Sequence, residues 1–168
     1  MNRKVRRCGG FLPVLLLLGC AHSKTRVERA NSFDFSRYQR IGVSAFTDRH
    51  GDGRRIAEGI DSGLRRIDRG GADLKAIEET LKKNKPDRDF GLGIEVLEYL
   101  RNKASADAIL FGAVAPDRRA VSVTMIDTES GEPVLRAVVR PSGKKQKSFA
   151  GADDVIRETL RVFESLAQ

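Results

Sequence analysis

The chain has 168 residues, a formal net charge of +8 and no tryptophan, and its only two cysteines are Cys8 and Cys20. Residues 21–168 therefore contain no cysteine for a disulfide, a thiolate nucleophile or a metal site. Half of the charge excess comes from four cations among the first seven residues, so residues 20–168 carry a formal charge of only +4. This mild excess excludes the strongly basic footprint of a nucleic-acid-binding protein, and we expect no nucleic-acid partner.

The first twenty residues have the layout of an exported leader. A basic head at residues 2–7 precedes an apolar run at residues 12–18, which covers about half of the ~20 residues that a membrane-spanning helix needs. The run ends in Leu17-Leu18-Gly19-Cys20, which resembles the bacterial lipobox. The resemblance implies a signal peptide at residues 1–19, cleavage before Cys20, a diacylglycerol thioether on its sulfur and an acylated amino terminus.

Residues 20–32 are expected to form the lipidated amino terminus and a mobile tether. Residues 21–29 are polar and charged and show no periodicity, as is typical of a linker. Ala21 and His22 follow Cys20 without an acidic residue. By resemblance to enterobacterial lipoproteins, this favours the outer membrane over the inner one.

The first half of the predicted domain contains one strand and three helices. Alternation of apolar residues predicts a strand at residues 41–46, and a loop rich in Asp and Gly follows at 47–53. Apolar spacings of three and four predict helices at residues 54–67, 72–81 and 91–103. Asp73 suits the start of the second helix, and Ile94 is expected on the apolar side of the third.

The second half contains three strands and a closing helix. Residues 108–114 form a nearly continuous apolar run, which is typical of a central strand covered on both faces. Residues 120–127 and 133–140 alternate around a turn and predict an antiparallel hairpin, with the second strand at an edge of the sheet. Asp153 and Asp154 suit the start of a last helix. The sequence predicts one mixed α/β domain over residues 33–168, in the order β-α-α-α-β-β-β-α.

Two segments resemble a group of bacterial envelope lipoproteins. Residues 33–46 are similar to the opening strand of lipoproteins related to CsgG, LpoB and the amino-terminal domain of TolB, in which a tyrosine and a basic residue precede an apolar strand. Residues 104–114 and 121–132 look like the group's alanine-aspartate, strand and glycine, followed by a strand that ends in aspartate-threonine and glycine-glutamate. Gly112 would allow close backbone approach, and Gly131 would supply a positive φ in the turn. The resemblance describes a fold, and Ala45 departs from it where a proline is usual.

His50 is the main candidate for chemistry in the predicted domain. It lies near Asp48 and Asp52 in the first loop, where a metal site or a general base is conceivable. A metal usually needs three or more protein ligands at fixed geometry, so we favour a solvated turn. The sequence predicts no catalytic residue, no metal and no cofactor.

Basic residues near the end of the hairpin mark a candidate interaction surface. They are Arg136, Arg140, Lys144, Lys145 and Lys147. The three lysines could meet anionic phospholipid or an anionic polymer, although we favour a loop that only confers solubility. Residues 133–140 could receive a partner strand at the sheet edge, where Arg136 and Arg140 would discourage indiscriminate pairing. The fold resemblance and Cys20 together lead us to expect a non-catalytic, lipid-anchored and periplasm-facing adaptor or assembly lipoprotein of the cell envelope, with an envelope protein as partner. The alternative is an envelope lipoprotein that binds, or hydrolyses, a polymer or ligand through the His50 loop.

Overall fold

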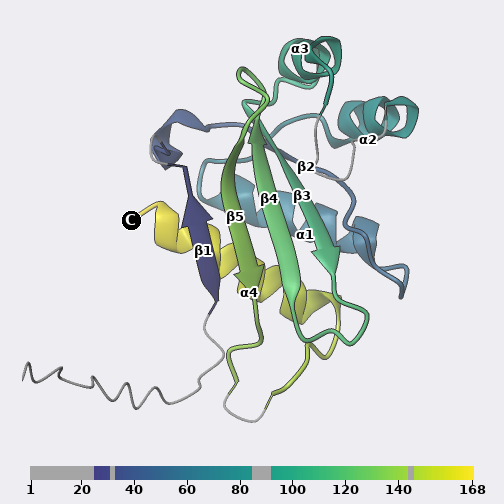
Figure 1. Ribbon diagram of the computed structural model, residues 1–168, viewed down its shortest axis with the longest axis vertical. Coiled ribbons are helices and arrows are strands. Elements are labelled where there is room, and N and C mark those ends of the chain that lie inside the picture. Colours follow the sequence, from purple (N-terminus) through teal and green to yellow (C-terminus); the bar gives the residue numbers. More distant parts are fainter. Residues whose placement is uncertain (1–24, 31–32, 85–91, 144–145) are drawn as a thin grey trace, which may run out of the picture.

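A five-stranded sheet in the order β1-β5-β4-β3-β2 forms the centre of the computed structural model (Figure 1). The structure describes residues 25–30, 33–84, 92–143 and 146–168. Its strands are β1 Arg26–Arg29, β2 Ile41–Val43, β3 Ala108–Val114, β4 Val121–Asp127 and β5 Pro133–Val139, and its helices are α1 Gly53–Arg66, α2 Leu74–Lys83, α3 Ile94–Lys103 and α4 Ala152–Leu166. The predicted mixed α/β class is confirmed, as is the predicted order from β2 onward. Within the described residues, none of the helices is both long and apolar enough to span a membrane.

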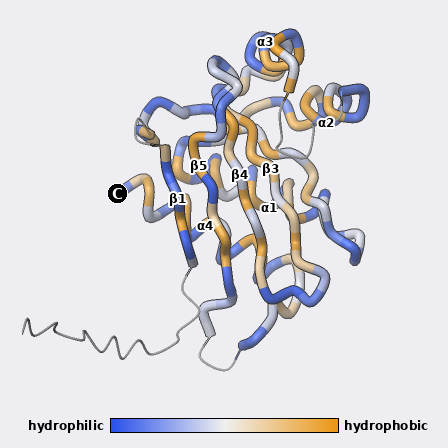
Figure 2. The backbone as a smooth tube through the Cα atoms, viewed as in Figure 1, coloured by the Kyte–Doolittle hydropathy of each residue, from blue (hydrophilic) through white to orange (hydrophobic). Residues whose placement is uncertain are grey.

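The predicted central strand β3 is covered on both faces. It pairs in parallel with β2 and antiparallel with β4, and Ile109 and Leu110, which point to opposite faces, are both fully buried. Figure 2 shows the hydrophobic colour running along most of β3 and β4. A continuous apolar run is what a strand needs when neither face meets water.

Helices cover the two faces of the sheet unequally. Helices α1 and α4 pack side by side on one face, over a large apolar core that includes Ile60, Leu110 and Phe163. Helices α2 and α3 cover a smaller core on the other face, which includes Leu100 and Ile109, and Figure 1 shows them gathered toward one end of the sheet. The sheet therefore has an open region on the second face.

The prediction for Ile94 in α3 is wrong. Leu97 and Leu100 are buried as expected, but the side chain of Ile94 is 62% exposed. Ile94 is the first residue of the helix, so α3 begins one turn before the core against which it packs.

Strand β1 corrects two predictions from the sequence. Arg26–Arg29 was expected to belong to the tether, yet these residues pair antiparallel with β5, with Arg26 opposite Val138 and Arg29 opposite Leu135. Consequently β5 is not an edge strand, and β1 takes that place. Three of the four residues of β1 are exposed, so the strand is held mainly by backbone pairing and leaves little hydrophobic signal.

The motifs behind the family resemblance meet at one end of the sheet. The Tyr38 hydroxyl donates a buried hydrogen bond of 2.9 Å to Asp127, and burial together with this bond raises the pKa of Tyr38 to about 12. The Asp107 carboxylate accepts the backbone N–H groups of Gln39 and Arg40. Gly131 has a φ of +74° in the β4–β5 turn, as expected. Tyr38 and Asp127 fasten the segment before β2 to the end of β4, and Asp107 fastens it to the start of β3, so their role is structural.

Candidate functional site

The strand register brings several basic segments to one end of the sheet. Val114, Val121 and Val139 lie in one row, and Arg26 lies opposite Val138 beside this row. The start of β1, the β3–β4 loop and the chain after β5 therefore share one end of the domain (Figure 1). We call it the basic end, defined by Arg26, Arg140 and Lys147.

Residues 140–152 give this end its charge. They contain four Lys or Arg residues and no Asp or Glu. Arg140 and Lys147 are exposed, and neither forms an ion pair with another described residue. Arg26, by contrast, pairs with Glu28 at 2.7 Å. Arg140 and Lys147 are therefore unpaired cations in the described part of the loop after β5.

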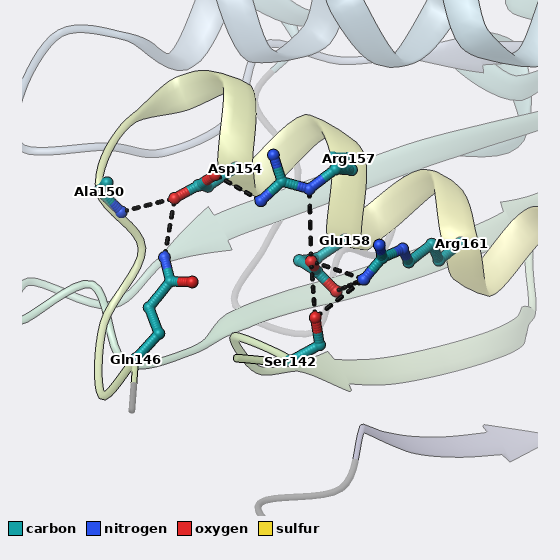
Figure 3. A network of polar contacts seen from close by, with 7 residues as sticks. All are labelled: Ser142, Gln146, Ala150, Asp154, Arg157, Glu158 and Arg161. Atoms are coloured by element: carbon teal, nitrogen blue, oxygen red, sulfur yellow. Dashed lines mark hydrogen bonds and ion pairs between the residues drawn. The ribbon is translucent and has the colours of Figure 1, made fainter. Parts of the chain in front are cut away.

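The loop has a first arm that follows Arg140 and a second arm that leads into α4. Asp154 fixes the second arm to α4 (Figure 3). Its carboxylate accepts the backbone N–H of Ala150 at 3.0 Å and the side-chain amide of Gln146 at 2.8 Å, and it also pairs with Arg157. The bond from Ala150, followed by those from Arg157 and Gln146, lowers the pKa of Asp154. An acid in the first turn of a helix thus binds the segment that leads into it.

Glu158 fixes the first arm one turn further along α4. Its side chain is 8% exposed and accepts a hydrogen bond of 3.0 Å from the Ser142 hydroxyl. Arg161 approaches both carboxylate oxygens at 2.9 and 3.0 Å and also donates to Ser142. A nearly buried carboxylate with these partners holds the start of the loop against the helix.

Arg118 connects the loop to two further segments. Its guanidinium pairs with Asp52 at 3.0 Å, in the loop before α1. Its carbonyl accepts the N–H of Phe149 at 2.8 Å, and Phe149 is buried. Three loops at the basic end are therefore joined through one residue of the β3–β4 loop.

The structure separates the residues of the predicted interaction surface. Arg140 and Lys147 lie at the basic end, whereas Arg136 is exposed in the middle of β5, opposite Thr124 on one side and Glu28 on the other. Lys144, Lys145 and the predicted lipid attachment site Cys20 lie outside the described residues. The surface is thus not one patch, because Arg136 faces the open region of the sheet.

The carboxylates around His50 are engaged elsewhere. Asp48 accepts the backbone N–H of Asp52 at 3.0 Å, and Asp52 pairs with Arg118. His50 is exposed beside Gly51, whose φ is +80°. In the part of the chain that the structure describes, no group of three or more His, Cys, Asp and Glu could hold a metal ion. The arrangement is that of a polar turn.

We call the contacts of Asp154 and Glu158 with the loop after β5 the clamp on α4. These contacts were not predicted from the sequence. Asp154 and Arg157, like Glu158 and Arg161, stand three residues apart, a spacing that places charges side by side on a helix. This spacing in the sequence indicates ion pairs along the helix, but the sequence analysis assigned Asp154 only to the start of the helix. The contacts of Asp154 and Glu158 with the loop depend on how the chain turns back after β5. No local sequence pattern encodes that turn.

Comparisons with known proteins identify the fold and no sequence family. No protein-family model and no curated protein matches the sequence. Among solved structures, the PelC dodecamer from Paraburkholderia phytofirmans matches 86% of this chain and 96% of its own, with a TM-score of 0.54 and 19% identity. Lipoprotein GNA1162 from Neisseria meningitidis (76% and 96% covered, 16% identity) and E. coli LpoB (83% and 82% covered, 12% identity) match with TM-scores of 0.45 and 0.40. The chain shares its fold with PelC, and the two lower scores carry no argument.

Proposed function

We propose that this chain is a lipid-anchored, periplasm-facing protein of the bacterial cell envelope that acts by assembling with other proteins and not by catalysis. The observation that carries the proposal is Leu17-Leu18-Gly19-Cys20, which stands six residues before the first strand of the domain. A lipid at Cys20 would confine the domain to one membrane surface. Confinement raises the effective concentration of a partner on the same surface, so modest contacts are sufficient.

The use of the carboxylates supports a non-enzymatic role. Asp127 and Asp107 fasten the segment before β2 to the end of β4 and the start of β3. Asp52 pairs with Arg118, and Asp154 and Glu158 hold the loop after β5. Each of these acids is engaged in a structural contact. General acid or base catalysis needs a group within reach of a substrate proton.

A second copy of the chain is the first partner to test. PelC, whose fold this chain shares, is described as a dodecamer. The edge strand β1 and the open region of the sheet near Arg136 offer surfaces for a protein contact. Charged residues on β1 would limit indiscriminate strand pairing.

The experiment compares Cys20→Ala with Cys8→Ala in cells. The Cys20→Ala protein should no longer be found in the membrane fraction, from which detergent releases the wild-type protein. Cys8→Ala, which removes the cysteine of the predicted leader, should keep its membrane attachment. Crosslinking of the wild-type protein in the intact envelope should then give discrete protein adducts, including multiples of the chain. Membrane attachment that survives Cys20→Ala would remove the lipobox argument, and the absence of any protein adduct would contradict the assembly role.

A further inference from the structure

We propose that the basic end of the domain lies against the anionic phospholipid surface of the membrane that holds Cys20. The inference rests on the proposed lipid anchor and adds an orientation and a contact chemistry to it. Arg140 and Lys147 are the exposed cations that would meet the phosphate groups, with Arg26 beside them at the start of β1.

The length of the tether limits the orientation of the domain. Five residues separate Cys20 from Arg26, and a fully extended chain spans at most about 20 Å between these two residues. The strands from Val114 to Ala108 rise away from the basic end by about 20 Å, and Figure 1 shows α3 beyond their far end. Placing the far end on the membrane would therefore require the entire reach of the tether, whereas the basic end needs only a small part of it.

The charges of the two ends agree with this orientation. At the basic end, Asp52, Asp117 and Glu28 each pair with an arginine, and Asp48 accepts the backbone N–H of Asp52. Arg140 and Lys147 are in excess of these pairs. At the far end, the β4–β5 turn exposes Glu129 and Glu132, but Glu129 lies 4.0 Å from Arg37, and α3 exposes the cations Arg101 and Lys103. The far end thus carries charges of both signs, and an anionic surface would attract the basic end more strongly.

The clamp on α4 explains how the loop can present its cations at a defined place. Pro141 and Phe149 are buried at the two arms of the loop, and Glu158 and Asp154 bind Ser142 and Ala150. Because both arms are fixed, Arg140 and Lys147 lose less conformational freedom when they meet a surface.

The test uses the full-length lipidated chain, purified from membranes and incorporated into vesicles. Leader cleavage removes Cys8 and lipid occupies Cys20, so an introduced cysteine is the single free thiol. A fluorophore on Ser148→Cys reports the basic end, and one on Asn102→Cys reports α3 at the far end. Quenching by a lipid that carries a nitroxide on its headgroup measures how close each label lies to the surface.

In vesicles of phosphatidylcholine mixed with phosphatidylglycerol, Ser148→Cys should be quenched and Asn102→Cys should not. High salt or phosphatidylcholine alone should reduce the difference, because both remove the attraction. The double variant Arg140→Gln with Lys147→Gln removes both cations. It should lower the ratio of molecules whose basic end lies on the membrane to those whose basic end does not, by about five-fold for each cation. The matched control, Arg101→Gln with Lys103→Gln at the end of α3, removes the same charge and should leave the ratio unchanged.

The outcomes separate the orientation from the anchor. A chain that enters vesicles independently of Cys20 would contradict the proposed function. A chain that is anchored through Cys20 but shows equal quenching of both labels would overturn the orientation alone. An equal effect of the basic-end and α3 variants would show that net charge, and not this surface, governs the result.

Discussion

Gly112 gives the sharpest test of how the central strand is packed. A Cβ atom at this position would lie 2.0 Å from Cε1 of Phe46 and 2.3 Å from two other carbons of the same ring. Phe46 is buried, with 4% of its surface exposed, and the N–H of the next residue, Thr47, donates to the carbonyl of Gly112 at 2.9 Å. The ring and the backbone are therefore both held in place, and Gly112→Ala should force one of them to move.

We expect Gly112→Ala to lower the free energy of unfolding by about 2–3 kcal/mol, at the upper end of the usual cost of overpacking. For a domain of this size, the melting temperature should fall by roughly 5–10 °C. Thermal and urea unfolding followed by circular dichroism measure both quantities. Gly93→Ala is the matched control, because a Cβ at that position would meet no atom within 4 Å.

The double variant with Phe46→Leu tests the cause of the destabilisation. Phe46→Leu removes the ring carbons that the new Cβ would meet, so the combined loss should fall short of the sum of the two single losses by about 1 kcal/mol or more. Additive losses, or equal effects of Gly112→Ala and Gly93→Ala, would refute the reasoning.

Three further predictions concern the clamp, the anchor and the His50 loop. The pKa of Asp154 is lowered in the fold, so its contribution is fully present above its ordinary value of 3.8 and is lost as pH falls through that value toward the folded pKa; acid titration of unfolding should be less steep for Asp154→Asn than for the wild type. Ala21→Asp should shift the protein from the outer to the inner membrane in density-gradient fractions if the proposed sorting operates, and unchanged fractions would contradict it. His50→Ala should keep membrane attachment, crosslinks and melting temperature, whereas loss of crosslinks in a folded variant would favour the ligand-binding alternative.

The sequence predicted the interior of the fold better than its rim. Residues 108–114 were assigned correctly because a strand that is buried on both faces must be apolar throughout. Strand β1 was missed because Val27 is its one apolar residue and the exposed Arg26, Glu28 and Arg29 follow no burial pattern. An edge strand held by backbone hydrogen bonds does not require such a pattern.

The candidate site was predicted in part for a similar reason. The count of Lys and Arg in residues 140–152 identified a basic segment before its position was known. Its place beside the start of β1 depends on the pairing of Arg26 with Val138, which lie far apart in the sequence. Arg136 belongs to the same basic stretch of sequence but faces the open region of the sheet. The sequence therefore indicated the correct residue type for this surface, but it wrongly grouped Arg136 with the residues of the basic end.

The residues of the family resemblance and the clamp on α4 lie at opposite ends of the sheet, which explains why the resemblance describes a fold and not a site. Tyr38, Asp107 and Asp127 carry the resemblance, and they fasten the end of the sheet away from the tether. The clamp of Asp154 and Glu158 lies at the opposite end and belongs to none of the resembling segments. A search by motif therefore identifies the far end, while the end that a lipid at Cys20 would bring to the membrane is recognised only from its charges and its contacts. Function in this chain is thus best sought where the resemblance stops.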